Sequence, residues 1–240
     1  DGDTTLVLNT DYTHTNYTNN TNAGTADINI AGTGNYPGTA VGHFTINKAD
    51  YNMGAIGFAD ATKTYNGTAQ SIAITGTLPT GADAKTVTVN YSGSATNVSD
   101  NPQTITATFA TTSTNYNVPE AKTAILTIIP AEITVSGITA DDKVYDGTTD
   151  ATLNYSGMSL TGMIGGDDLD ATATGAFEDK NVGANKQVDL SDLTLTGTDV
   201  GNYVLAASGQ QTTTTADITA KTVVVSGITA DDKEYDTTTA

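Results

Sequence analysis

The segment Val135–Tyr145 recurs 90 residues later as Val225–Tyr235, with a single substitution of Val144 by Glu234. A fixed offset between near-identical segments indicates tandem modules, each of which is a folding unit of its own. We therefore expect modules of about 80 to 90 residues, and we interpret the function of the chain as that of an array.

The composition predicts strands rather than helices. Thr, Ala, Gly and Asp dominate, whereas Glu, Lys and Leu are sparse, which is typical of strands and turns. Apolar residues alternate with polar ones at 26–30, 71–76 and 86–91, as they do in half-buried strands. The predicted fold class is all-β, with serial immunoglobulin-like β-sandwich modules in a rod-like tandem array.

Recurring turn sequences divide the chain into four parts. A truncated repeat that lacks its opening strand occupies 1–49, and its first predicted strand is the short apolar run 6–8. Two complete repeats follow at 50–130 and 131–220. Residues 221–240 match the beginning of a further repeat, with an opening strand to spare. The four parts together indicate a piece of a longer repetitive protein.

The charge balance and the absence of cysteine limit the classes of partner and compartment. The net charge is −18 and there is no Arg, so we expect the chain to repel nucleic acid. The absence of Cys fits an extracellular, cell-surface protein of a bacterium or archaeon that folds without disulfides. The longest apolar runs, such as 124–129, are too short to span a membrane.

The third part resembles a known repeat family. With the lead-in Ile-Thr-Ala-Asp-Asp-Lys at 138–143 and the turn Tyr-Asp-Gly-Thr-Thr at 145–149, residues 131–220 resemble a YDG repeat of large bacterial surface proteins. In the last part, Thr237 stands where that pattern has Gly, so we expect a different turn there.

The second part resembles the related MBG repeats through its motifs at 63–69, 75–79 and 115–117. The first part is similar to another immunoglobulin-like repeat of bacterial surface proteins. These resemblances imply an exported adhesin or stalk built of β-sandwich modules. They imply no catalytic residues.

A catalytic constellation is missing from the sequence as well. A serine or cysteine nucleophile needs a base within reach and a third group that orients the base. There is no Cys, and both histidines, His14 and His43, lie in strand-like, Thr-rich sequence. Carboxylate pairs arise from composition alone in so acidic a chain. We therefore predict no enzymatic activity.

Calcium is the one cofactor that the sequence suggests. Asp167, Asp168 and Asp170 place three carboxylates on a Gly-rich loop, and hard cations favour several oxygen ligands. Their spacing matches no known calcium loop, so solvated turn carboxylates are the alternative interpretation. Isopeptide cross-links would need a buried lysine, whereas the pattern predicts that Lys143 and Lys233 are exposed.

Tyrosines recur at equivalent turns of the modules. Three of them directly follow Asn, namely Tyr36, Tyr116 and Tyr203. Three others precede Asn or Asp, namely Tyr65, Tyr145 and Tyr235. Such side chains could form a carbohydrate-binding platform. Because they recur in every module, we favour corner tyrosines whose rings pack on the core and whose hydroxyls bond to backbone.

The function that we predict is a structural stalk or fibre segment of a bacterial extracellular surface protein. Its partners would be neighbouring modules of the same or identical chains, and surface glycans or other cells. One alternative is a self-assembling filament subunit, in which residues 222–240 of one copy complete residues 1–49 of the next by strand donation. The other is an adhesion module that binds glycans or Ca²⁺.

Overall fold

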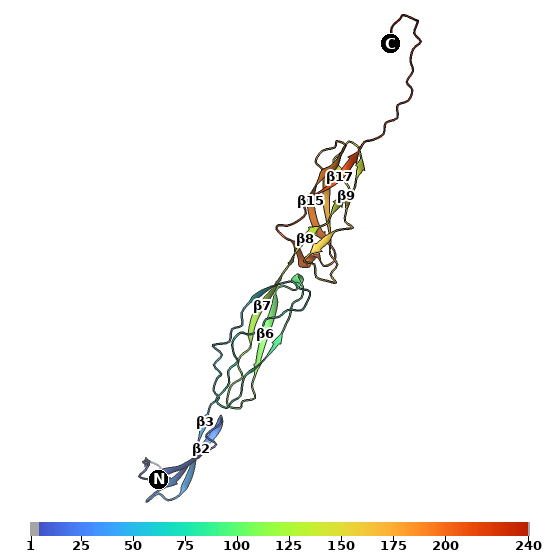
Figure 1. Ribbon diagram of the computed structural model, residues 1–240. Coiled ribbons are helices and arrows are strands. Elements are labelled where there is room, and N and C mark those ends of the chain that lie inside the picture. The colour runs from blue at the N-terminus through green and yellow to red at the C-terminus, as the bar shows by residue number, and fades with distance from the viewer. Residues whose placement is uncertain (1–4, 240) are drawn as a thin grey trace. The chain divides into compact units, whose positions relative to one another are not determined.

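A computed structural model describes residues 5–239 and is all-β, as predicted (Figure 1). The helical residues among these form two 3-10 turns of three residues each, η1 (Val98–Asp100) and η2 (Val200–Asn202). The chain divides into two compact units at the junction between Ile129 and Pro130. The rod-like arrangement of modules stays a prediction.

The first unit begins with a three-stranded antiparallel sheet in the order β1-β2-β3. The strands are β1 (Tyr12–Thr18), β2 (Gly24–Gly32) and β3 (Thr39–Ile46). The predicted strand at 6–8 is wrong, because the chain turns back there. Asn9 adopts a φ of 67°, and the carboxylate of Asp11 accepts the N–H of Val7 at 2.9 Å.

The second sheet of this unit has four strands in the order β4-β7-β6-β5. They are β4 (Ala61–Thr64), β5 (Thr88–Ser92), β6 (Gln103–Ala110) and β7 (Lys122–Ile129). Strands β6 and β7 alternate buried apolar and more exposed residues, so one face of the sheet forms core. The predicted strand at 71–76 is reduced to one bridge, between Gly57 and Thr75.

The second unit contains three sheets. The largest has the order β10-β17-β15-β14-β11, a second has β13-β8-β16, and the third pairs β12 with β9. The strands are β8 (Ala131–Ser136), β9 (Thr139–Ala140), β10 (Lys143–Val144), β11 (Asp150–Ala151), β12 (Leu153–Asn154), β13 (Ser159–Thr161), β14 (Asp170–Phe177), β15 (Gly183–Thr196), β16 (Tyr203–Leu205) and β17 (Thr213–Thr219).

The core of the second unit draws on more than one of these sheets. Strand β8 buries Ile133 and Val135, and the largest sheet buries Phe177, Val188 and Ile218. Period-two alternation of side chains along β8, β14 and β17 produces this division between core and solvent. The arrangement is consistent with a β-sandwich.

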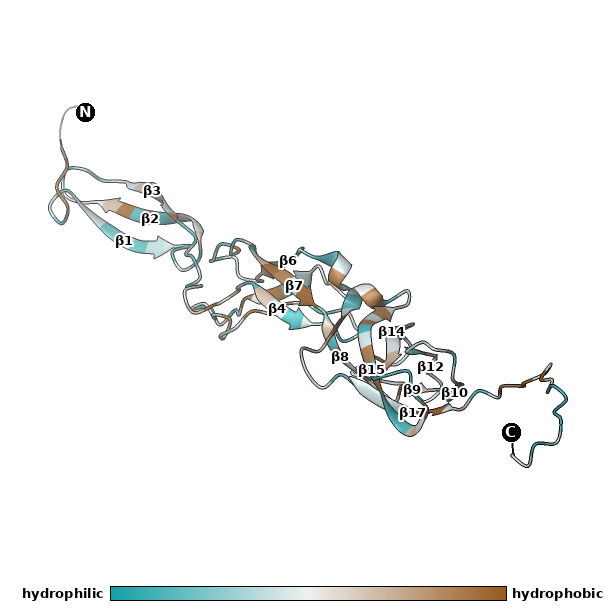
Figure 2. Ribbon diagram, turned by 90° about the horizontal axis from the view of Figure 1, so that it is seen from above, coloured by the Kyte–Doolittle hydropathy of each residue, from teal (hydrophilic) through white to brown (hydrophobic). Residues whose placement is uncertain are grey.

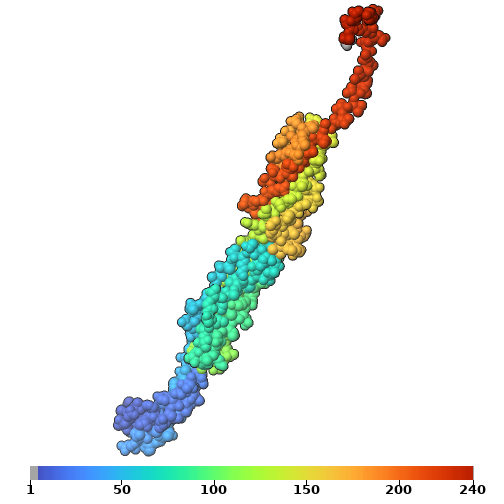
Figure 3. Space-filling model, viewed as in Figure 1, coloured from blue at the N-terminus to red at the C-terminus, as the bar shows by residue number. Residues whose placement is uncertain are grey.

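Residues 221–239 contain no strand or helix, and every one of them is exposed. In Figure 3 they leave the folded unit as a thread that ends in a small cluster of atoms, and in Figure 2 the segment is first hydrophobic and then hydrophilic. The sequence predicted an opening strand here. A strand needs a neighbour for its backbone N–H and C=O groups, and no partner for this segment lies among residues 5–239.

Candidate functional site

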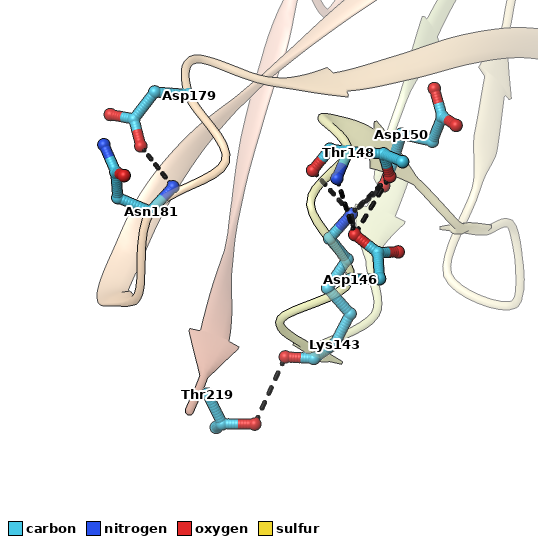
Figure 4. A network of polar contacts seen from close by, with 7 residues as sticks. All are labelled: Lys143, Asp146, Thr148, Asp150, Asp179, Asn181 and Thr219. Carbon is cyan, nitrogen blue, oxygen red and sulfur yellow. Dashed lines mark hydrogen bonds and ion pairs between the residues drawn. The ribbon is translucent and has the colours of Figure 1, made fainter. Parts of the chain in front are cut away.

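The turn after β10 is organised around the ammonium group of Lys143 (Figure 4). Lys143 Nζ donates to the carbonyl oxygens of Thr148 and Asp150 at 3.0 and 2.9 Å. It also lies 3.0 Å from Oδ1 of Asp146. The Lys143 side chain is only 16% exposed, so the prediction that this lysine is exposed is wrong. The lysine instead ties the turn to β10 and β11.

The same turn has a second set of bonds, which converge on Asp146. Its Oδ1 accepts the backbone N–H of Thr148 at 2.8 Å and the hydroxyl of Thr148 at 3.0 Å. Between them Gly147 has a φ of 87°, a left-handed conformation that glycine adopts without steric cost. The Thr148 N–H, and then Lys143, lower the pKa of Asp146 from 3.8 to about 2.

Two sister turns repeat this arrangement. In the first unit, Asn66 Oδ1 accepts the N–H and the hydroxyl of Thr68 at 3.0 and 2.9 Å. In the C-terminal segment, Asp236 Oδ1 accepts the same two groups of Thr238, at 3.0 and 2.8 Å. Lys233 reaches this last turn as well, with its Nζ 2.8 Å from Asp236 Oδ1.

The prediction that Thr237 gives a different turn is wrong. Thr237 has a φ of 63°, the left-handed conformation that Gly147 adopts in the sister turn. A β-branched residue pays roughly 1 to 2 kcal/mol for this conformation. The bonds that Asp236 makes with Lys233 and Thr238 impose the turn in spite of that cost.

In each of the two units, this turn lies where a segment near the start of the module meets the module's last strand. In the second unit, β10 runs parallel to β17, with Lys143 opposite Ile218. The N–H of Tyr145 then donates to the carbonyl of Thr219 at 2.8 Å. In the first unit, β4 runs parallel to β7, and the N–H of Tyr65 donates to Ile129 at 2.8 Å.

The tyrosines that precede Asn or Asp differ in burial. Tyr65 is buried, and Tyr145 packs against the core cluster of Phe177, Val188, Ala216 and Ile218. Tyr235 is 92% exposed, because no strand lies beside it as β17 lies beside Tyr145 within residues 5–239. Tyr235 therefore does not pack on a core as Tyr145 does.

The tyrosines that follow the Asn landmark close loops in two of the modules. The hydroxyl of Tyr116 accepts the N–H of Ala82 at 2.9 Å. The hydroxyl of Tyr203 accepts the N–H of Ile164 at 3.0 Å and donates to Asp167 at 2.5 Å. Tyr36 differs, because it is 40% exposed and lines an open pocket.

The three calcium candidates do not converge. Asp167 accepts the hydroxyl of Tyr203, Asp168 Oδ2 accepts the hydroxyl of Thr198 at 2.9 Å, and Asp170 bonds to the next backbone N–H. Across the described part of the chain, residues 5–239, no three acidic or histidine side chains gather in a way that could hold a metal ion. Asp167 and Asp168 each bond to a segment far away in the sequence.

A buried lysine that sequence reasoning missed lies on β15. Lys186 Nζ donates to Asp179 Oδ1 at 2.8 Å and lies 3.5 Å from Glu178 Oε1. The bond to Asp179 raises the pKa of Lys186 and lowers that of Asp179. The sequence contained a signal for this burial, because Lys186 shares a strand face with the core residue Val188, two positions further on.

Comparisons with known proteins identify one domain. Residues 129–215 match the model of the YDG domain family. No curated protein matches the chain. The resemblance of residues 50–130 to MBG repeats stays a prediction.

One solved structure shows a faint similarity. It is a SusE-like, surface-located polysaccharide-binding protein from the heparin utilisation locus of Bacteroides thetaiotaomicron. The identity is 13% and the TM-score is 0.18, over 88% of this chain and 36% of that one. None of the helices among residues 5–239 is long and apolar enough to cross a membrane.

The bonds of Lys143 predict that its replacement weakens the second unit. Lys143→Met keeps the aliphatic stem but removes the ammonium from two carbonyls and one carboxylate. We expect a loss of about 1 to 3 kcal/mol of unfolding free energy, measured by hydrogen exchange of residues 140–150 in the full chain. The matched control is Lys180→Met, at an exposed lysine, with a change within about 0.5 kcal/mol. Equal effects would contradict this role.

The low pKa of Asp146 predicts a pH dependence. Its folded-state pKa of about 2 lies below the usual 3.8, so ionised Asp146 stabilises the second unit above about pH 4 and loses this effect as the pH falls through 2. Asp146→Asn keeps an oxygen that can accept the Thr148 N–H, as Asn66 does, but lacks the charge. We expect its melting temperature to lie below that of the wild type at pH 7, and the two to converge near pH 2. A gap that is independent of pH would contradict this explanation.

Proposed function

We propose that this chain, which carries a YDG domain at residues 129–215, is a structural segment of an extracellular surface protein that transmits mechanical load between its ends. The observation that carries the proposal is the parallel pairing of an early strand with the last strand in two modules, β4 with β7 and β10 with β17.

The direction of these strands determines how they resist force. Load on a tandem protein enters a module at its first segment and leaves at its last strand. When these two strands are parallel, tension pulls them past each other along their length. All bonds between them are then loaded together, whereas strands that are pulled apart from one end lose their bonds one at a time.

The lysine turn supports the same role. It fastens β10 to the residues that follow, so that pulling on Lys143 does not simply peel the segment away. The net charge of −18 keeps such an extracellular protein soluble and self-repelling. We propose that the segment has no enzymatic activity and that its work is mechanical.

Single-molecule pulling tests this function. Stretching the full chain from its termini should unfold the second unit in one step that releases the residues between Lys143 and Thr219, roughly 25 nm of contour length. A handle at Lys180→Cys, paired with one at the C-terminus, pulls β15 and β17 from the same end and should need less force. The absence of native Cys makes this attachment specific. Equal forces in both geometries would contradict the load path.

Glycan binding is a second candidate, favoured by one observation. An open pocket of about 570 Å³ is lined by Tyr12, Tyr36, Asp11 and Asn35, among other residues. Aromatic rings beside carboxylate and amide groups suit a sugar. If this function is correct, the wild-type protein binds members of an oligosaccharide array, Tyr36→Ala loses that binding and Tyr91→Ala, which changes an equally exposed tyrosine away from this pocket, retains it. No binding by the wild type would exclude it.

A further inference from the structure

The turn after β4 contains the single Asn-Gly pair of the sequence, Asn66-Gly67. Both residues are exposed, so solvent reaches the side-chain amide and the peptide bond beside it. Gly67 has a φ of 73° and no side chain that hinders an approach of its own backbone nitrogen to the Asn66 side chain. Within residues 5–239, the N–H of Gly67 donates no hydrogen bond. This nitrogen is therefore available as a nucleophile.

The amide group of Asn66 is held by two donors of Thr68. Its Oδ1 accepts the backbone N–H of Thr68 at 3.0 Å and the hydroxyl of Thr68 at 2.9 Å. Attack of a nucleophile on Cγ of Asn66 puts negative charge on this same oxygen, and fixed donors at a developing oxyanion lower the barrier of such a step. The turn thus polarises the carbon that a neighbouring nitrogen would attack.

The sister turns have a carboxylate where this turn has an amide. Asp146 and Asp236 accept the N–H and the hydroxyl of the threonine two positions later, as Asn66 does. Both aspartates also lie beside the lysine three positions earlier, at 3.0 and 2.8 Å from its Nζ. The first of these pairs is drawn in Figure 4. The hydrogen bonds of this turn are therefore compatible with a carboxylate.

The lysine of that ion pair is present in the first unit as well. Lys63 lies three positions before Asn66. In the parallel pairing of β4 with β7 it lies opposite Ile128, which is the position that Lys143 has in the pairing of β10 with β17. Its Nζ donates to the carbonyl of Ser71 at 2.8 Å, so its side chain already reaches across the turn. Within the described part of the chain, Lys63 belongs to none of the ion pairs.

We propose that Asn66 is a self-modification site, at which the turn converts its own asparagine into an aspartate that pairs with Lys63. The backbone nitrogen of Gly67 gives its proton to a base from solvent and forms a bond with Cγ of Asn66. The bond between Cγ and Nδ2 then breaks, and Nδ2 takes up a proton and leaves as ammonia. The product is a cyclic imide that joins Cγ and the main-chain carbonyl carbon of residue 66 through the Gly67 nitrogen.

Water opens the imide, and the carbonyl that it attacks decides the product. Attack at Cγ breaks the new bond to the Gly67 nitrogen, returns a proton to that nitrogen and leaves an aspartate in an unchanged backbone. Attack at the main-chain carbonyl gives isoaspartate, in which the backbone runs through the former side chain. The two Thr68 donors polarise Cγ, so we expect aspartate. The net reaction consumes water and releases ammonia, and no electron is transferred.

The modification supplies the counter-charge that Lys63 lacks in this turn. It would give the first unit the same lysine–aspartate pair that holds the turn after β10 in the second unit. This inference goes beyond the proposed load-bearing role, because the reaction depends on the turn alone and not on what the module carries.

The first test follows the conversion by mass. The full chain, incubated in mildly alkaline buffer, should gain the mass of an amide-to-acid exchange in the peptide that contains residues 61–70. Gly67→Thr is the matched control, because Thr237 shows that a β-branched residue adopts this turn, with a φ of 63°. Its side chain blocks the approach of the backbone nitrogen, so the conversion should be lost on the same timescale.

The two donors of Thr68 are tested through the rate and the product. Thr68→Val removes the hydroxyl and keeps the backbone N–H, so conversion should slow by roughly three- to tenfold. The share of isoaspartate should rise as well, because Cγ is less polarised. Fragmentation of the peptide in the mass spectrometer distinguishes aspartate from isoaspartate.

The second test concerns the pairing with Lys63. Asn66→Asp supplies the product directly and should raise the melting temperature of the first unit by roughly 1 to 4 °C at neutral pH, measured by calorimetry of the full chain. The same substitution in a Lys63→Met background should give no rise. This double-mutant cycle isolates the ion pair from the other effects of each substitution.

Three outcomes would overturn the proposal. The first is an Asn66 amide that converts no faster than the other asparagines of the chain, and the second is isoaspartate as the main product of the wild type. The third is an equal effect of Asn66→Asp with and without Lys63. The pulling experiment concerns the second unit and does not depend on these results, so the two proposals can fail separately.

Discussion

The structure depends on the pairing of each module's closing strand with the segment that opens the module. Strand β17 lies between β15 and β10, and β7 lies between β6 and β4, so both closing strands have neighbours on two sides. Without the opening segment, a closing strand becomes an edge with unsatisfied backbone groups and the core loses its cover.

The lysine turn makes this pairing specific. A two-residue strand such as β10 has little to hold it in place by backbone bonds alone. Lys143 supplements them by joining the turn, β10 and β11 through its single ammonium group. The aspartate beside it balances this charge, and the ammonium nitrogen also lies over the ring of Phe177, 5.5 Å from the ring centroid. The carboxylate of Asp146 thus has a structural role in this turn.

Much of the fold could be predicted from the sequence, because repeats and alternation are local signals. They indicated the all-β class and the turns that recur at Tyr65, Tyr145 and Tyr235. They could not indicate that Lys143 is covered, since its cover comes from residues that follow the turn, or that Asp167 and Asp168 bond to different loops. The prediction of a strand at 71–76 was wrong for the same reason. Alternation indicates burial of one face, but it does not indicate whether a neighbouring strand supplies backbone partners.

The lysine turn also bears on the order of folding during synthesis. Its bonds span five residues or fewer between Lys233 and Thr238, so the turn closes a very short loop. The parallel partner of such a turn is far away in sequence: β17 follows β10 by about 75 residues. A ribosome delivers the turn first and the closing strand last. Each module therefore stays incompletely folded, with its turn already formed, until its closing strand has been synthesised and can pair.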